Sequence, residues 1–211
     1  MKKIELKPIL ITILLVSFQG ATFFLLRPFQ SEPYLIGGFI DKMIPFNIIS
    51  VIPYYMWYLL LVIVPYILYL KDKKSFIKYC LSYIFVVLIA DIIFMITPSI
   101  VERPVIYGND ILSLMTKFIY WVDNPPLNCF PSIHCAISCL FFLYIASSKY
   151  TNNIEKMVIS FISVLIMIST LTIKQHVLID LIVGDGIAML VFMFINKETR
   201  LSKSFKKLFK I

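Results

Sequence analysis

Long uncharged runs alternate with short charged connections along this chain of 211 residues. Six of the runs come close to the roughly 20 residues that an apolar helix needs to cross a bilayer. These runs are residues 8–26, 48–70, 79–97, 130–146, 157–173 and 178–195. The pattern predicts an all-α, polytopic membrane protein whose six transmembrane helices form one bundle.

The composition supports this class and limits the number of domains. Hydrophobic residues make up 60% of the chain, and the mean hydropathy is +0.89. A soluble domain of this size could not bury so much apolar sequence. We therefore expect a single membrane-embedded domain over residues 1–211, with a basic tail at 202–211.

The positions of Lys and Arg predict the orientation in the membrane. Fifteen of the 20 lie near the two termini and in alternate connections, and five lie in the other connections. Since cytoplasmic loops are enriched in Lys and Arg, we expect a multi-pass protein of the cell membrane with both termini in the cytoplasm. The net charge of +8 therefore reflects topology, and no nucleic-acid partner is expected. The basic tail is expected to lie on the anionic inner leaflet.

Two outer connections are long enough to have structure of their own. Residues 27–46 contain Pro28, Pro33 and the pair Gly37-Gly38 between apolar residues, and are expected to form an interfacial or re-entrant lid. Residues 98–129 form the other long connection.

The four cysteines, Cys80, Cys129, Cys135 and Cys139, do not outline a disulfide framework. Cys135 and Cys139 could join His134 in a metal site, but a thiolate in lipid is costly. We interpret the cysteines as small packing residues, and expect no metal and no cofactor.

Both histidines of the chain lie next to predicted spans on the outer side. His134 is near the start of the fourth run, and His176 comes just before the sixth. Asp180 follows His176 by four residues, so on a helix the two side chains would share one face. A carboxylate there can accept a proton from one ring nitrogen and leave the other free as a nucleophile. Either histidine alone could be an interfacial or capping residue, but their convergence with Arg103 and Lys174 on one side favours a catalytic site.

The order and spacing of these residues resemble the type-2 phosphatidic acid phosphatase superfamily, which contains lipid phosphatases and phosphotransferases. Its three motifs are Lys-x6-Arg-Pro, Pro-Ser-(Gly)-His and Ser-Arg-x5-His-x3-Asp. Over roughly residues 97–185 the chain has the corresponding segments Arg103-Pro104, Pro131-Ser132-x-His134 and Ser169-x6-His176-x3-Asp180.

Three positions depart from the family pattern. Ile96 stands where the first motif has lysine, Thr170 where the third has arginine, and Ile133 where the second has glycine. Two phosphate-binding cations are therefore missing. Lys174, two residues before His176, is the expected substitute.

The resemblance implies a division of roles. His176 attacks phosphorus and forms a phosphohistidine, while Asp180 holds its tautomer. His134 protonates the leaving oxygen and then activates water or an acceptor alcohol. The charge on the phosphoryl oxygens must be stabilised without a metal. The resemblance assigns this to three substrate-binding side chains: Arg103, Ser132 and Lys174.

The main hypothesis is a membrane lipid phosphatase that hydrolyses a lipid phosphomonoester or a polyprenyl diphosphate at the extracytoplasmic face. Residues 128–134 and 174–176 are also similar to the branch containing inositol-phosphorylceramide synthases, which leaves open a lipid headgroup phosphotransferase with an alcohol acceptor. A proton-coupled transporter subunit is the non-enzyme alternative, because Asp91 and Asp185 lie inside predicted spans. The missing cations also suit a catalytically inactive lipid-binding scaffold.

Overall fold

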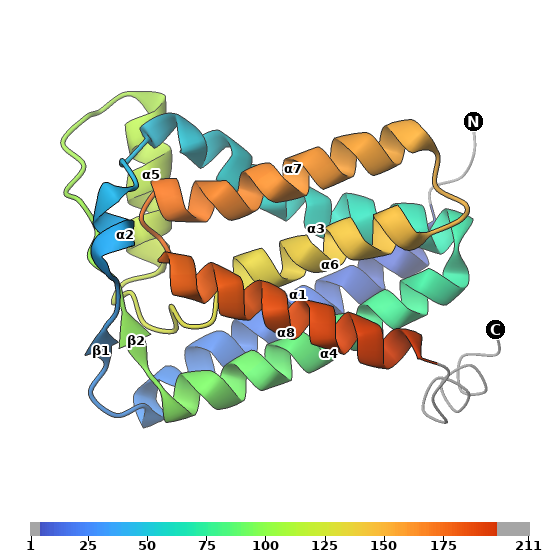
Figure 1. The fold of residues 1–211 in the computed structure, drawn as a ribbon, viewed down its shortest axis with the longest axis horizontal. Helices are drawn as coiled ribbons and strands as arrows, with labels where there is room; N and C mark the ends of the chain where they lie inside the picture. Colours follow the sequence, from blue (N-terminus) through green and yellow to red (C-terminus); the bar gives the residue numbers. More distant parts are fainter. Residues whose placement is uncertain (1–4, 198–211) are drawn as a thin grey trace.

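Helices make up most of the computed structural model, which describes residues 5–197 (Figure 1). The predicted basic tail at 202–211 lies outside these residues. The elements, where η is a 3-10 helix, are α1 (Leu6–Leu25), η1 (Arg27–Phe29), β1 (Tyr34–Leu35), α2 (Phe39–Met43), η2 (Ile48–Ser50), α3 (Val51–Lys71), α4 (Lys73–Ile96), β2 (Ser99–Ile100), α5 (Ile111–Val122), α6 (Ile133–Ser147), α7 (Asn153–Thr172) and α8 (Leu178–Asn196).

The helices α1, α3, α4, α6, α7 and α8 run along one axis and alternate in direction, which confirms the all-α bundle (Figure 1). As a result, α1 begins and α8 ends at the same end of the bundle. Five of these helices are long and apolar enough to cross a bilayer. The remaining one, α6, has 15 residues, fewer than the roughly 20 that a span needs, so the sixth span stays a prediction.

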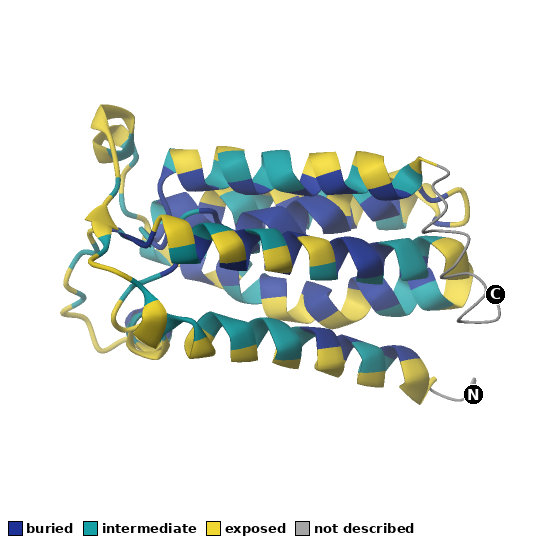
Figure 2. Cartoon of the chain, turned by 90° about the horizontal axis from the view of Figure 1, so that it is seen from below, coloured by how far each residue is buried: buried dark blue, intermediate teal, exposed yellow. Residues whose placement is uncertain are grey.

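The core of the bundle is built around α6, which packs against α3, α4, α7 and α8. Its side chains Ile137, Leu140 and Phe141 are fully buried. Figure 2 shows buried residues on the inward faces of the long helices and exposed residues on the outward faces. Many of the exposed residues are large and apolar, for example Leu14 and Leu59. An apolar outer surface of this extent is suited to lipid contact.

Close packing between α6 and α8 depends on Gly184. A Cβ at this position would lie 2.5 Å from the backbone oxygen of Ser132, just before α6. Only glycine leaves room for the two backbones to approach this closely. At Gly186, by contrast, a Cβ would meet nothing within 4 Å. Gly184 therefore lets α8 lie against the start of α6, where His134 is located.

At one end of the bundle, the connections form a small cap. The strands β1 and β2 pair in parallel, with Tyr34 opposite Ser99, and join the segment after α1 to the segment after α4. The expected lid at 27–46 contains η1, β1 and α2, and α2 lies beside the strand pair (Figure 1).

The second long connection contains a helix that the sequence pattern does not predict. The structure has α5 within residues 98–129, running crosswise to the bundle (Figure 1). The carboxylate of Asp110 caps it by accepting from the backbone N–H groups of Leu112 and Ser113. Ile119 packs in a small cluster with Val51. This buried face stabilises a helix of 12 residues, which is too short to cross the membrane.

Candidate functional site

His176 lies in the short loop between α7 and α8, where its side chain is 8% exposed. Lys174 in the same loop has a φ of 55°, and this left-handed residue turns the chain at the end of α7. The backbone N–H groups of Gln175 and His176 both donate to the carbonyl oxygen of Thr170, at 3.0 and 3.1 Å. The end of α7 therefore fixes the loop that presents His176.

Asp180 lies in the first turn of α8 and reaches back to His176. Its Oδ2 lies 3.2 Å from Nδ1 of His176 and accepts the backbone N–H of Val177 at 3.0 Å. The sequence predicts that the histidine and the carboxylate share a helical face. However, His176 precedes the helix, so the carboxylate makes the contact while capping the helix start. Asp180 is completely buried, and its Oδ1 has no partner among the described residues.

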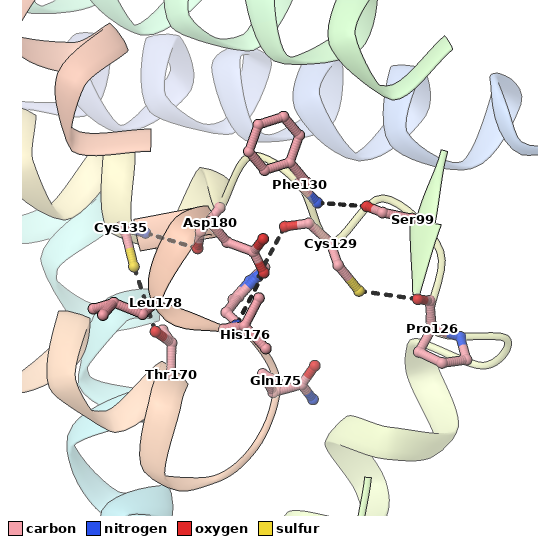
Figure 3. A network of polar contacts seen from close by, with 12 residues as sticks. Ser99, Pro126, Cys129, Phe130, Cys135, Thr170, Gln175, His176, Leu178 and Asp180 are labelled. Carbon is pink, nitrogen blue, oxygen red and sulfur yellow. Dashed lines mark hydrogen bonds and ion pairs between the residues drawn. The ribbon is translucent and has the colours of Figure 1, made fainter. Parts of the chain in front are cut away.

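The hydrogen-bond partners of His176 determine its tautomer. Figure 3 shows the carbonyl group of Cys129 and the carboxylate of Asp180 converging on this ring. Nδ1 lies 3.0 Å from the Cys129 oxygen and 3.2 Å from Asp180 Oδ2. A carbonyl oxygen can only accept, so Nδ1 carries the hydrogen. In the neutral ring, Nε2 therefore keeps its lone pair.

Cys129 contacts His176 through its backbone oxygen and not through its thiol. The thiol donates to the carbonyl oxygen of Pro126 at 3.0 Å, and the next N–H, of Phe130, donates to Ser99 Oγ at 2.9 Å (Figure 3). Burial raises the pKa of the Cys129 thiol, which keeps it uncharged. Within residues 5–197, no group of three or more His, Cys, Asp or Glu side chains is placed to hold a metal ion.

His134 is the second residue of α6 and faces α3. Its Nε2 lies 3.0 Å from the hydroxyl of Tyr54, and its ring lies against Trp57 with centroids 4.3 Å apart. The ring centroids of His134 and His176 are 5.9 Å apart. The structure thus brings the two predicted histidines together. It also adds Tyr54 and Trp57, which sequence analysis missed because aromatic residues in an apolar helix are normally packing residues.

Ser132 connects the starts of α6 and α8. Its Oγ caps α6 by accepting the backbone N–H of Cys135 at 3.2 Å. Its own N–H donates to the backbone oxygen of Asp180 at 3.1 Å. The side chain is completely buried, and its hydroxyl also contacts the thiol of Cys135. Its role in substrate binding stays a prediction.

Arg103 is held in a buried network of charges. Its guanidinium donates to the carboxylate of Asp123 and, at 3.1 Å, to the backbone oxygen of the same residue. It also lies over the ring of Tyr120, 5.0 Å from the centroid. The other carboxylate oxygen of Asp123 pairs with Arg27 from η1. The sequence pattern does not single out Arg27 or Asp123, because nothing local links residues so far apart in the chain.

Gln175 presents an unused amide donor beside His176. Its Oε1 accepts from Arg103, because a guanidinium has only donors. This contact directs the NH₂ group elsewhere, and Nε2 is buried without a partner in the described part of the chain. Gln175 is 3% exposed. A buried donor is costly to leave unpaired, so Nε2 is available to an acceptor atom.

Two cavities meet at His176. The larger, of about 880 Å³, is lined mainly by apolar side chains of α1, α3 and α5 and also by His134, Gln175 and His176. The smaller, of about 640 Å³, is lined by residues 35–38, 41–42 and 44–46, together with Arg103, His176 and others. We call them the apolar and the polar cavity. Both volumes are usual for small-molecule sites.

Lys174 lines the polar cavity and holds its wall. Its Nζ donates to the backbone oxygens of Asp41 and Ile44, at 2.8 and 2.5 Å. An ammonium has three donors, so one remains. Thr170, where the family pattern has arginine, is completely buried, and its hydroxyl donates to the backbone oxygen of Met167 at 2.7 Å. The two cations that are predicted to bind the substrate, Lys174 and Arg103, therefore both line this cavity.

Comparison with known proteins identifies a family. Residues 74–201 match the family model described as the PAP2 superfamily, whose members are phosphatases or phosphotransferases. The match covers more than half of the chain and includes Arg103, His134, His176 and Asp180. A search of curated proteins and a search of solved structures each found no match.

Proposed function

Because the chain belongs to the PAP2 superfamily, we propose that it is a membrane lipid phosphatase. Its substrate is a lipid phosphomonoester or a polyprenyl diphosphate, and its reaction passes through a phosphohistidine at the extracytoplasmic face. One observation carries the proposal. Both hydrogen-bond partners of Nδ1 of His176 leave Nε2 as a nucleophile beside a second histidine.

In the first step, Nε2 of His176 attacks phosphorus, and the bond from phosphorus to the lipid oxygen breaks. His134 gives its proton to that oxygen, so the lipid leaves as an alcohol. The His176 ring becomes positively charged, and the buried carboxylate of Asp180 stabilises this charge through Nδ1.

In the second step, a water molecule attacks the phosphohistidine. His134, now neutral, accepts the proton of the water, and the bond from phosphorus to Nε2 breaks. Inorganic phosphate leaves, and both histidines return to their starting states.

Protein side chains, rather than a metal, balance the charge on the phosphoryl oxygens in this proposal. Arg103 and Lys174 line the polar cavity beside His176, and Gln175 has an unused buried donor next to it. The hydroxyl of Ser132 lies at the start of α6 and is the further donor of this proposal. Donors fixed in a buried site stabilise developing charge strongly, because they need not reorganise during the reaction.

The apolar cavity supports a lipid substrate. It extends from the two histidines along α1 and α3, between side chains such as Phe23, Trp57 and Leu59. A hydrocarbon chain placed there removes apolar surface from water, at about 25 cal/mol per Å². The transporter hypothesis lacks such support, since Asp91 and Asp185 line neither of the two cavities.

Phosphate release from a panel of lipid phosphates tests the proposal. Protein purified in detergent should hydrolyse phosphatidic acid, phosphatidylglycerol phosphate or a polyprenyl diphosphate, with or without EDTA. His176→Ala should be inactive. Lys117→Ala, at a position that lines neither cavity, should keep full activity. Failure on every lipid would refute the phosphatase, and loss of activity in EDTA that one divalent ion restores would refute metal independence.

A further inference from the structure

The charged side chains that line the two cavities have no net charge. Three are carboxylates and three are cations, namely Asp41, Glu102 and Asp123 against Lys42, Lys174 and Arg103. The balance stays the same without Lys42 and Glu102, which are exposed to solvent. Ile96 and Thr170 stand where the family pattern has two further cations. A net positive charge for a phosphoryl group therefore has to come from behind the cavity lining.

The charge of Arg103 is the one that a neighbouring carboxylate opposes most directly. Its guanidinium donates to Oδ2 of Asp123 and, at 3.1 Å, to the backbone oxygen of the same residue. Two opposite charges in contact largely cancel at a distance. Their opposition also reaches Cys129, where burial is the main cause of the raised pKa of the thiol, Arg103 lowers this pKa and Asp123 raises it. With Asp123 as its only ionic partner, Arg103 would attract an anion weakly.

A second guanidinium binds the other side of the same carboxylate. Arg27 pairs with Oδ1 of Asp123, while Arg103 pairs with Oδ2. One negative charge is thus shared between two positive charges, and the three side chains together are positive. Arg27 lines neither of the two cavities. Its influence on the lining therefore passes through Asp123.

The fold holds Arg27 in this position. Its guanidinium lies over the rings of Phe23 and Phe24, 4.7 and 4.9 Å from their centroids. The side chains of Arg27 and Arg103 are 11% and 10% exposed. Solvent and salt screen buried charges less than exposed ones. A charge at Arg27 can therefore still be felt at the cavity that Arg103 lines.

We propose that Arg27 is a positioning residue, which binds one side of Asp123 and so leaves the positive charge of Arg103 available to a phosphoryl group. The inference rests on the proposed function, in which Arg103 stabilises the phosphoryl oxygens. It adds a residue that lies outside the three family motifs. In this arrangement Asp123 fixes the direction of both arginines, and Arg27 compensates for the negative charge that Asp123 brings.

Binding of inorganic phosphate measures this charge without turnover. Phosphate is titrated at constant ionic strength into the purified protein in detergent, and the midpoint temperature of unfolding is recorded. A ligand that binds only the folded protein raises this temperature, and its dissociation constant follows from the concentration dependence. The KM for phosphatidic acid is the second measurement.

The main variant removes the compensating charge. In Arg27→Gln, Asp123 is left with Arg103 alone, so the dissociation constant of phosphate and the KM should both rise about tenfold. Arg27→Lys keeps the positive charge and should bind phosphate nearly as well as the parent protein. Lys117→Gln removes a cation that lines neither cavity and should change neither quantity.

A second change separates an electrostatic role from a structural one. Arg27→Gln combined with Asp123→Asn has the same net charge at this place as the parent protein, and should regain its affinity for phosphate. If the ion pairs only held the cap together, the double variant would be weaker than either single variant. The single change Asp123→Asn removes the opposing charge and should tighten phosphate binding about tenfold. This variant decides the question if Arg27→Gln does not fold.

The outcomes distinguish this inference from the proposed function. Parent-like affinity in Arg27→Gln, no recovery in the double variant, or weaker binding in Asp123→Asn would overturn the inference. Hydrolysis of lipid phosphates by the parent protein would then leave the phosphatase intact. A parent protein that neither binds phosphate nor hydrolyses any lipid phosphate would refute the phosphatase, and the inference with it.

Discussion

The hydroxyl of Tyr54 lies 3.0 Å from Nε2 of His134, and both residues line the apolar cavity. Trp57, one turn further along α3, lies against the same ring, with centroids 4.3 Å apart. His134, the proposed acid–base residue, is thus held by a helix that contains no family motif. Because a proton donor depends on its orientation, we expect α3 to contribute to catalysis by positioning His134.

Removing this hydroxyl should slow catalysis without unfolding the protein. Tyr54→Phe keeps the ring but loses one hydrogen bond, which is worth roughly 1 kcal/mol. We expect kcat to fall about tenfold, with little change in KM. Tyr55→Phe is the control, since the Tyr55 hydroxyl donates to the backbone of Met115 and not to a histidine. Equal activity of the two variants would show that Tyr54 only fills space.

Replacing each of the two histidines should have a different effect on the phosphoenzyme. His176→Ala should abolish any acid-labile phosphoenzyme, because the nucleophile is lost. His134→Ala should still become phosphorylated by an aryl phosphate, whose leaving group needs no proton, but should lose its phosphate slowly. Acid-quenched labelling with a phosphorus-labelled substrate and peptide mapping measures both. A label on His134, or one that survives in His176→Ala, would mean that the roles are reversed.

Lys174 should contribute both its positive charge and its hydrogen bonds to the segment that contains Asp41 and Ile44. Lys174→Ala should reduce turnover roughly a hundredfold, as loss of a fixed charge-stabilising donor does in other enzymes. It should also loosen α2, because the two bonds to Asp41 and Ile44 disappear. Lys174→Arg should retain more activity than the alanine variant. Full activity in Lys174→Ala would mean that Arg103 and Gln175, without Lys174, stabilise the charge on the phosphoryl oxygens.

Two glycines of α8 offer a matched pair for testing the contact with α6. Gly184→Ala places a Cβ 2.5 Å from the backbone oxygen of Ser132, so the helices must separate, at a cost of about 1–3 kcal/mol. Gly186→Ala meets nothing within 4 Å and should leave stability unchanged or slightly raised. The midpoint temperature of thermal unfolding in detergent and kcat should both fall for Gly184→Ala, and neither should fall for Gly186→Ala. The same loss in both variants would point to a general effect of alanine.

The site should face the outside of the cell. This follows from the distribution of Lys and Arg and from the position of the cap at one end of the bundle. A cysteine at Asn109, in the cap connection, should react with an impermeant maleimide in intact cells. A cysteine at Asn153, at the start of α7, should not react. The opposite pattern would place the substrate in the inner leaflet.

The fold was largely predictable because each membrane helix corresponds to a long apolar run in the sequence. An apolar run of about 20 residues can satisfy its backbone in lipid only as a helix, so the run itself predicts the element. The order of Arg103, His134, His176 and Asp180 likewise predicted residues that the fold brings to one end of the bundle, while their roles stay predictions. α5 was missed since its 12 residues depend on burial against other elements.

The sequence by itself determined the class of protein, its long helices and the two histidines with their carboxylate. Only the tertiary structure decided how these groups are arranged. It showed that Asp180 reaches His176 by capping a helix, that Tyr54 contacts His134, and that among residues 5–197 His176 alone lines both cavities. These relationships join residues from different helices, as Tyr54 and His134 are 80 positions apart. Local patterns report on neighbours within a turn or two, whereas a site is completed by contacts that exist only after the helices have packed.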